Sequence, residues 1–165
     1  MALVGLLLGL QRLHQWHLQL WHGDHGWHAQ SATIASELKA WCQVQELDLQ
    51  ISRSTRESTG TEASARSWRY QKLAVLSQQL CCRTVLTAHT ASDRAETWLL
   101  QLARGTDLAG LGSLRPIRPL QNNDPSGPRL VRPLLSFSRD DTAQICQDLK
   151  LPIWLDPSNA NPAFS

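Results

Sequence analysis

The residues best suited to chemistry stand together near the middle of the chain. His89, Asp93 and Glu96 follow the short apolar run at 85–88, and Arg104 comes one helix length later. In an open parallel sheet, ligands bind where a strand runs into a helix start, and the free helix N–H groups there suit an anion. These residues therefore indicate a binding site for an anionic ligand at this junction.

A strand and a helix must position these side chains. The apolar run from Val85 to Ala88, bounded by polar residues, predicts a buried strand. Thr90 stands three residues before Asp93, which predicts a helix start with a capping box, and Gly105 predicts the helix end. The apolar residues of this helix recur on one face: Ala95, Trp98, Leu99, Leu102 and Ala103.

The same charged residues also have a purely structural interpretation. Asp93 and Glu96 lie in the first turn of the predicted helix, where each carboxylate stabilises the helix dipole by about 0.3–1 kcal/mol. Arg104 holds the complementary position in the last turn. Local spacing alone leaves the structural and the functional interpretation open.

Composition and charge limit the class of protein. With 165 residues, of which 42% are apolar and 18% charged, the chain is typical of one globular domain. A net charge of +2 is too small to indicate a nucleic-acid partner by itself. Arginines nevertheless cluster where only Asp107 and Asp124 oppose them, and arginine suits bidentate contact with phosphate. The clustered residues are Arg104, Arg115, Arg118, Arg129 and Arg132. A solvated basic face is the alternative explanation.

Neither the cysteines nor the histidines form a strong metal-binding motif. The cysteines are Cys42, Cys81, Cys82 and Cys146. They show no C-x-x-C spacing, and reduced thiols in a cytosolic protein are the expectation. His22, His25 and His28 repeat every third residue beside Asp24, which offers a metal cluster as an alternative, but no cysteine or glutamate completes the set.

The start of the chain does not predict a membrane protein. Residues 1–10 are apolar but too few to span a bilayer. No basic residue precedes them and no small-residue cleavage site clearly follows, unlike in a signal peptide. A cytoplasmic protein is therefore expected.

Apolar periodicity predicts the order of the elements. Helices are expected at 1–14, 34–42, 61–80, 93–104 and 138–149, and strands at 16–20, 47–51 and 85–88, with a loop at 22–26. Their alternation predicts βαβ units and a doubly wound α/β fold, with a mostly parallel sheet and helices on both faces. Arg66 stands four residues before Tyr70 and could point into a site at the sheet end, unless it pairs with Glu62.

Four sequence blocks carry a resemblance to a known family. The chain resembles the tRNA(Ile)-lysidine synthetases of the PP-loop ATP pyrophosphatase superfamily, and the blocks span nearly the whole chain in the family's order. The most specific block runs from Thr87-Ala88-His89 to Gly110-Leu111. The others are Asp24-His25-Gly26, residues 61–70, and the stretch from Arg132-Pro133-Leu134-Leu135 to Asp156-Pro157-Ser158-Asn159.

The resemblance implies an adenine-nucleotide alpha hydrolase-like fold and an ATP-dependent ligation on RNA. In that family, ATP adenylates carbon 2 of the wobble cytidine in tRNA(Ile) with a CAU anticodon. The amine of free lysine then displaces AMP to give lysidine, and Mg²⁺ assists the departure of pyrophosphate. The implied cofactors are ATP and Mg²⁺, the implied partners are tRNA(Ile) and lysine, and a homodimer is one implied state.

The resemblance also implies roles for individual residues. The implied catalytic group is His89, Asp93 and Glu96, in which Asp93 contacts an ammonium group or the Mg²⁺ bound with ATP. The implied nucleotide-binding residues are Asp24, His25 and Arg66. The implied contacts to tRNA or phosphate are Arg104, Arg132, Asp156 and Asn159.

The chain departs from the family pattern at both ends and at Thr90, where the family usually has a second histidine. The family's S-G-G-x-D-S loop and its first strand are missing, and the tail stops at Ser165. We therefore expect residues 1–165 to be an incomplete N-terminal PP-loop-type ATPase/ligase domain without the C-terminal domains. Removing about four buried aliphatic side chains with a central strand would forfeit ~6–12 kcal/mol of a total of ~5–15 kcal/mol. The chain is accordingly expected to fold poorly and to be inactive alone.

Other functions remain open at this point. Another PP-loop enzyme, such as a tRNA thiolase, is one alternative, although the cysteines lack a C-x-x-C motif and the sequence at 156–159 favours the lysidine enzymes. A tRNA-binding remnant that has lost catalysis is a second alternative. A histidine-rich metal-binding module is a third.

Overall fold

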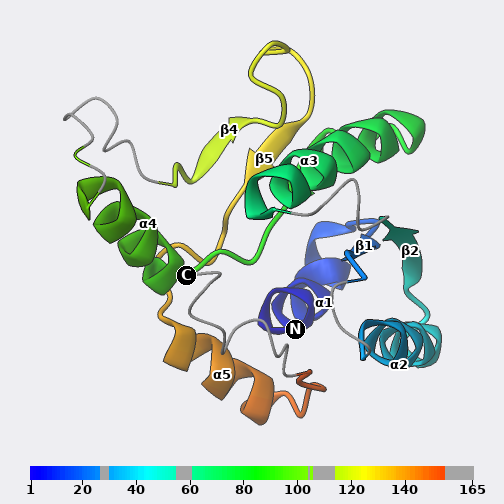
Figure 1. Cartoon of the computed structure of the whole chain (residues 1–165). Helices are drawn as coiled ribbons and strands as arrows, with labels where there is room; N and C mark the ends of the chain where they lie inside the picture. Colours follow the sequence, from blue (N-terminus) through cyan, green and yellow to red (C-terminus); the bar gives the residue numbers. More distant parts are fainter. Residues whose placement is uncertain (27–29, 55–60, 104, 106–113, 155–165) are drawn as a thin grey trace. The chain divides into compact units, whose positions relative to one another are not determined.

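The computed structural model describes residues 1–26, 30–54, 61–103, 105 and 114–154, and it divides the chain into two compact units. Unit 1 comprises Met1–Leu10 and Ala74–Ile153, and unit 2 comprises Gln11–Leu73 and Trp154–Ser165. The elements shown in Figure 1 are α1 (Ala2–His14), β1 (Gln19–Asp24), α2 (Ser31–Val44), β2 (Asp48–Arg53), α3 (Glu62–Gln79), β3 (Thr84–Leu86), α4 (Ala91–Ala103), β4 (Ile117–Pro119), β5 (Arg129–Val131) and α5 (Arg139–Asp148). None of the described helices is both long and apolar enough to cross a membrane.

Unit 2 contains a βαβ arrangement. Strands β1 and β2 are parallel, with Leu20 opposite Leu49, and α2 packs against both strands. Cys42 on α2 is almost completely buried. The predicted alternation of strand and helix is therefore confirmed in this part of the chain.

The position of β1 corrects the sequence prediction. A strand was expected at 16–20 and a loop at 22–26, whereas β1 spans Gln19–Asp24. The hydrogen-bonded register with β2 continues as far as the pair Asp24 and Arg53, which holds this segment extended. Gly23 also fits here because a Cβ atom at this position would lie 2.5 Å from the Trp21 ring and 3.0 Å from the Trp68 ring.

Unit 1 contains a three-stranded sheet in the order β3-β5-β4. Strands β3 and β5 are parallel and β4 is antiparallel to β5, so the sheets of the two units are mostly parallel, as predicted. Leu130 in the middle strand is fully buried, and Leu120, Leu134 and Leu135 are buried with it. The predicted strand at 85–88 is shorter than expected and forms Thr84–Leu86.

Helix α4 has the predicted ends but not a buried face. Thr90 and Asp93 form the capping box, and Gly105 has the left-handed φ of +67° that ends the helix. The apolar residues on its surface remain exposed: Leu99 is 64% exposed, and Trp98 and Leu102 are each 49% exposed. Helical spacing fixes which residues share a face, but burial requires a packed partner, and no residue of α4 is buried in the described structure.

Candidate active site at the starts of α4 and α5

The first turn of α4 is built around the Asp93 carboxylate. The backbone N–H and the hydroxyl group of Thr90 both donate to Asp93 Oδ2 at 2.7 Å, and the Asp93 N–H donates back to Thr90 Oγ1 at 3.3 Å. Thr90 is buried, whereas the Asp93 side chain is 33% exposed. The helix cap therefore engages Oδ2 of Asp93, and Oδ1 remains available to accept hydrogen bonds from other residues.

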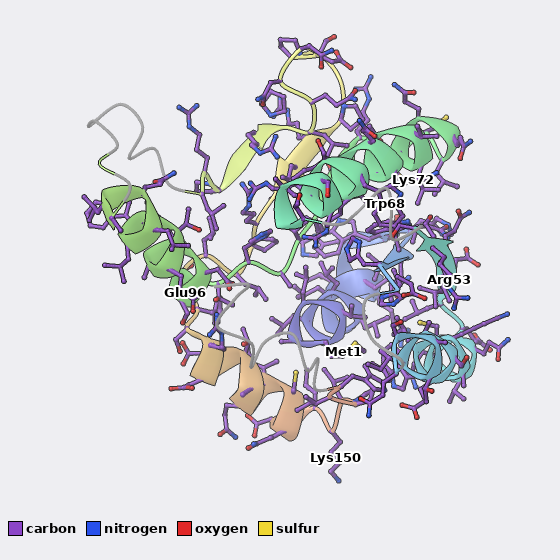
Figure 2. The ribbon with its side chains drawn as sticks, in the orientation of Figure 1. Met1, Arg53, Trp68, Lys72, Glu96 and Lys150 are labelled. Atoms are coloured by element: carbon purple, nitrogen blue, oxygen red, sulfur yellow. The ribbon has the colours of Figure 1, made fainter. Side chains whose placement is uncertain are left out.

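Arg139 joins the two carboxylates of α4. Its Nη2 donates to Glu96 Oε1 at 2.8 Å and to Asp93 Oδ1 at 3.2 Å, and Figure 2 labels Glu96 on α4. The backbone holds this arrangement, because the Arg139 N–H donates to Ser92 Oγ at 3.1 Å. The N–H of Ala91 also donates to the Phe137 carbonyl at 2.8 Å. The start of α5 is thus fixed against the first turn of α4.

No sequence pattern indicates a role for Arg139. Ser138 and Asp141 stand three residues apart, a spacing that predicts a capping box at the start of the helix expected at 138–149, and the structure confirms this capping box. It places Arg139 in the first helical turn but gives no sign of its partners, which lie 43 and 46 residues away in the chain. Only the tertiary structure brings this guanidinium to Asp93 and Glu96.

The surroundings of Asp93 and Arg139 favour the ionised forms of both side chains. Partial burial alone would raise the pKa of Asp93, but the hydrogen bonds from Thr90 and the Arg139 guanidinium outweigh it and lower the pKa below its ordinary value. Glu96, and then Asp93, raise the pKa of Arg139. Two carboxylates opposed by one guanidinium carry a net negative charge, and the side chains of Glu96 and Arg139 are 56% and 61% exposed. The cluster can therefore accept a further cation from solvent.

His89 lies between β3 and α4, beside this cluster in sequence. Its Nδ1 lies 2.9 Å from the Thr87 hydroxyl oxygen, which fixes one edge of the ring. His89, Asp93 and Glu96 thus follow the carboxyl end of β3, as the sequence predicts.

Asp24 has a different environment in unit 2. Its side chain is 1% exposed, and its Oδ2 accepts a 2.9 Å hydrogen bond from Arg53 Nε. Its Oδ1 accepts from the Gly26 N–H at 2.8 Å. Burial opposes ionisation, but the hydrogen bonds from Gly26, Arg53 and Ser31 lower the pKa of Asp24. The carboxylate thereby ties the ends of β1 and β2 together, and both of its oxygens are engaged within the protein.

An aromatic cluster surrounds the end of β1. The His25 ring lies edge-on to Trp68 with 5.0 Å between centroids, and the Trp21 ring lies 5.8 Å from Trp68. Trp21 also donates from Nε1 to Ser52 Oγ at 3.0 Å. The sequence analysis did not assign Trp68, which is labelled on α3 in Figure 2. Its distance in sequence from β1 left no local signal for this contact.

The two predicted arginine contacts differ in exposure. Arg66 is exposed, and its guanidinium lies 5.6 Å from the Tyr70 ring centroid in a cation–π contact. Arg132 is only 3% exposed, and its Nη1 donates to the Arg115 carbonyl at 2.7 Å. Burial in this position favours a structural role for Arg132 over the predicted contact with tRNA or phosphate.

The predicted residues therefore fall into two groups. Asp24, His25 and Arg66 belong to unit 2, and His89, Asp93 and Glu96 belong to unit 1. Three further predicted residues, Arg104, Asp156 and Asn159, lie outside the described part of the chain, as does His28 of the histidine cluster.

The donor set at α4 fits a metal that arrives with its ligand. Within the described ranges, no group of three or more His, Cys, Asp or Glu side chains is arranged to hold a metal ion by itself. Mg²⁺ bound to a nucleotide needs only one or two protein carboxylates, because phosphates and waters complete its coordination. Asp93 and Glu96 supply carboxylates of that kind.

Comparisons with known proteins agree on the family. A family model described as a PP-loop domain matches residues 1–165. A tRNA(Ile)-lysidine synthase from Parasynechococcus marenigrum is 61% identical over 165 residues, which is 100% of this chain and 49% of the relative. Another from Prochlorococcus marinus is 49% identical over 172 residues, covering 100% of this chain and 50% of the relative. The chain spans about half the length of these curated relatives.

A solved structure gives an independent view of the fold. The U34-tRNA thiolase NcsA from Methanococcus maripaludis, with its 4Fe-4S cluster, matches 92% of this chain and 54% of its own chain with a TM-score of 0.71. At 14% sequence identity this similarity concerns the fold alone. It confirms the α/β architecture predicted from the sequence.

Proposed function

Because the chain belongs to the PP-loop domain family, we propose that it supplies the nucleotide-handling part of a tRNA(Ile)-lysidine synthase. The observation that carries this proposal is the 61% identity to such an enzyme across all 165 residues. The charged cluster at the starts of α4 and α5 supports it, since an ionised carboxylate pair at a strand-to-helix junction suits metal-nucleotide chemistry.

The proposed reaction has two steps. The C2 oxygen of the wobble cytidine attacks the α-phosphorus of ATP, so that a C–O–P linkage forms and pyrophosphate leaves. The amine of lysine then attacks C2, AMP leaves with the oxygen, and a carbon–nitrogen bond remains in place of the carbonyl. ATP, lysine and tRNA(Ile) with a CAU anticodon are the proposed substrates, and the proposed location is the cytoplasm.

Asp93 and Glu96 are the proposed cation-binding side chains. Their negative charge would hold either the Mg²⁺ of the metal-nucleotide or the ammonium group of lysine. Mg²⁺, when bound, neutralises phosphate charge as pyrophosphate leaves. Arg139 bridges the two carboxylates through Nη2 and helps to lower the pKa of Asp93, so we assign it as a positioning residue.

His89 is the proposed proton-transfer group of the same cluster. Thr87 orients the ring through Nδ1, and an imidazole held in this way suits general acid–base catalysis. The lysine amine must lose protons before and during its attack on C2. An imidazole that stands just before these carboxylates in the chain, at the same strand-to-helix junction, suits that task.

The proposed nucleotide contacts come from unit 2. Asp24 is best explained as the residue that holds the β1 end in place, because both of its oxygens are already engaged. His25 and Arg66 remain the proposed contacts for the base or the phosphates. Arg104, Asp156 and Asn159 remain the proposed contacts for tRNA or phosphate, whereas the buried Arg132 is assigned a structural role. A homodimer remains the proposed assembly.

Identification of the product tests this function. Residues 1–165 replace the matching segment of the Parasynechococcus marenigrum enzyme, and the chimera is incubated with ATP, lysine and a tRNA(Ile) transcript. Nucleoside mass spectrometry should then show lysine joined to the wobble cytidine, dependent on both ATP and lysine. A folded chimera that leaves the cytidine unchanged, or that inserts sulfur instead, would refute the proposal.

A further inference from the structure

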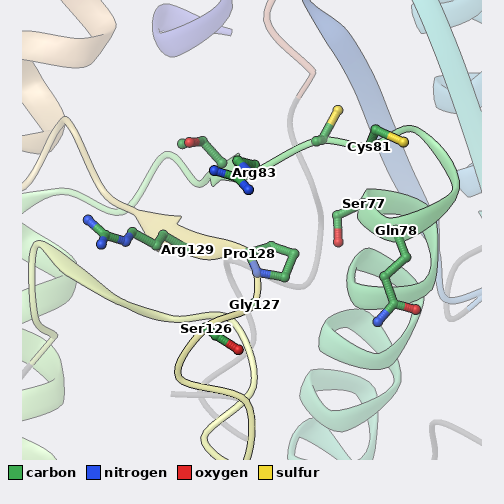
Figure 3. A pocket seen from close by; sticks show the side chains of 10 residues that line it. Ser77, Gln78, Cys81, Arg83, Ser126, Gly127, Pro128 and Arg129 are labelled. Atoms are coloured by element: carbon green, nitrogen blue, oxygen red, sulfur yellow. The ribbon is translucent and has the colours of Figure 1, made fainter.

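A concave site lies at the end of the unit 1 sheet opposite to the charged cluster. A pocket of about 570 Å³ opens at the amino-terminal ends of β3 and β5, whereas the site described above follows the carboxyl end of β3. Figure 3 shows its walls, which come from the last turn of α3, from residues 81–84, and from the loop at 126–129. The volume falls in the range of pockets that bind small ligands.

Two arginines are held side by side at this pocket. The N–H of Arg129 donates to the Arg83 carbonyl at 2.9 Å, and Arg129 is the register partner of Thr84 in the β3–β5 pair. Both arginine side chains are exposed and line the pocket. The parallel pairing of the strands therefore fixes the spacing of the two backbone positions that carry these positive side chains.

The lining carries no negative charge to oppose these arginines. No carboxylate lines the pocket, and in the described ranges neither Arg83 nor Arg129 forms an ion pair. The nearby Asp124 lies on its own turn, where the Ser126 hydroxyl donates to it at 3.1 Å. A Cβ atom at Gly127 would overlap the Asp124 carboxylate, so this acid packs tightly against the loop.

The α3 end that closes the pocket has lost most of its negative character. Its last carbonyls would disfavour an anion. However, the carbonyls of Leu76, Ser77 and Gln78 accept hydrogen bonds from the N–H groups of residues 80, 82 and 81, respectively. The Gln78 amide also lines the pocket and is exposed, which adds a neutral hydrogen-bond donor.

We propose that this pocket binds a phosphate group, with Arg83 and Arg129 as its charged ligands. Paired guanidinium groups bind tetrahedral oxyanions through bidentate hydrogen bonds, and the volume leaves room for the molecule that bears the phosphate. That molecule is either an RNA strand or a small phosphate such as pyrophosphate. The inference does not depend on the lysidine reaction, because the residues are separate from the α4 and α5 cluster.

Binding measurements on the chimera described above test this inference, because residues 1–165 are expected to fold poorly alone. Inorganic phosphate and pyrophosphate are titrated at constant ionic strength, with the backbone amide NMR signals of residues 126, 127 and 129 as the local readout. Labelled tRNA is titrated at several salt concentrations. The test variant carries Arg83→Gln and Arg129→Gln together. The control is Lys150→Gln, which removes a positive charge that does not line the pocket.

The two sources of phosphate give different results. For a small phosphate, the double variant should lose the local NMR shifts and bind pyrophosphate at least tenfold more weakly, with tRNA affinity unchanged. For RNA, tRNA affinity should fall and the log–log salt slope should decrease by about 1 to 2, as expected for one or two lost phosphate contacts. Lysines at both positions should restore part of the binding in either case. If neither probe shifts the loop signals of the parent chimera, or if the double variant binds both probes as tightly as the parent chimera does, the inference is wrong.

Discussion

Two aspartates of this protein each form an ion pair with an arginine, but they differ in their exposure to solvent. Asp24 and Asp93 each accept a hydrogen bond from an arginine, and each has a lowered pKa. The Asp24 side chain is 1% exposed and fully engaged, whereas the Asp93 side chain is 33% exposed and shares Arg139 with Glu96. The buried Asp24 therefore serves to join β1 to β2 through Arg53. The more accessible Asp93, in contrast, keeps negative charge available for a ligand.

The largest expected effect is a loss of enzymatic activity on substitution of Asp93. Asp93→Asn in the chimera removes the negative charge that is proposed to hold the cation. A bound metal ion contributes several kcal/mol by stabilising phosphate charge in the transition state. tRNA-dependent pyrophosphate release should fall by about 10²-fold or more. The free energy of unfolding should change by less than about 1 kcal/mol, since the charge is partly exposed.

A matched control uses another acid in a helix start. Asp140 lies in the first turn of α5 but outside the cluster, so Asp140→Asn should leave pyrophosphate release within about twofold. Equal losses in the two variants would show that general negative charge, rather than Asp93, matters.

The second effect concerns stability at the other aspartate. Asp24→Ala leaves the Gly26 N–H and the Arg53 guanidinium without their acceptor, so the free energy of unfolding should fall by about 2–3 kcal/mol. Urea unfolding followed by tryptophan fluorescence measures it. Asp48→Ala is the control on β2, because its contact with His17 is exposed and 3.8 Å long. A loss at Asp24 no greater than at Asp48 would contradict a locking role.

The third effect tests Arg139 as a positioning residue. Arg139→Gln removes the guanidinium that helps lower the pKa of Asp93, so this pKa should rise. Pyrophosphate release at neutral pH should fall about tenfold, the order expected for a supporting residue. The acid limb of its pH profile should also move to higher pH. Arg139→Lys should recover part of the rate; an unshifted profile would leave Arg139 with only a packing role.

The smallest effect is the pH dependence of stability. The pKa of Asp24 is lower in the folded chain than in the unfolded chain. The contribution of Asp24 to the free energy of unfolding is therefore present above about pH 4 and is lost as the pH falls through the folded pKa. Burial lowers the pKa of His22, although the charge of Asp24 partly opposes this shift. Below about pH 6.5, His22 therefore binds a proton more readily in the unfolded chain, which lowers the free energy of unfolding.

Unfolding free energies should therefore decline slightly from about pH 7 to about pH 5 and more steeply below about pH 4. Urea midpoints across this range measure the change. Asp24→Ala should flatten the lower part of the curve and His22→Gln the upper part. A curve that keeps its shape in both variants would contradict these assignments.

The sequence predicted what local chemistry determines. Thr90 with Asp93, and Ser138 with Asp141, lie three residues apart, so their capping boxes could be recognised from spacing alone. The alternation of strands and helices and the position of His89 after β3 follow from periodicity in the same way.

The remaining features depend on contacts between distant segments. Arg139 donates to Glu96, which is 43 residues away in the chain. Trp68 of α3 contacts His25, which follows β1. The strand β1 extends to Asp24 because β2 pairs with it. The apolar residues of α4 share a face, but none of the α4 residues that the structure describes is buried. No local pattern specifies such partners.

The most direct test compares lysine incorporation by the Asp93→Asn and Asp24→Ala chimeras, expressed per folded molecule. Radiolabelled lysine entering tRNA(Ile) is counted at a temperature where both variants remain folded. The account predicts a loss of about 10²-fold or more for Asp93→Asn and less than about fivefold for Asp24→Ala. Equal losses, or an Asp93→Asn rate close to that of the parent chimera, would contradict it.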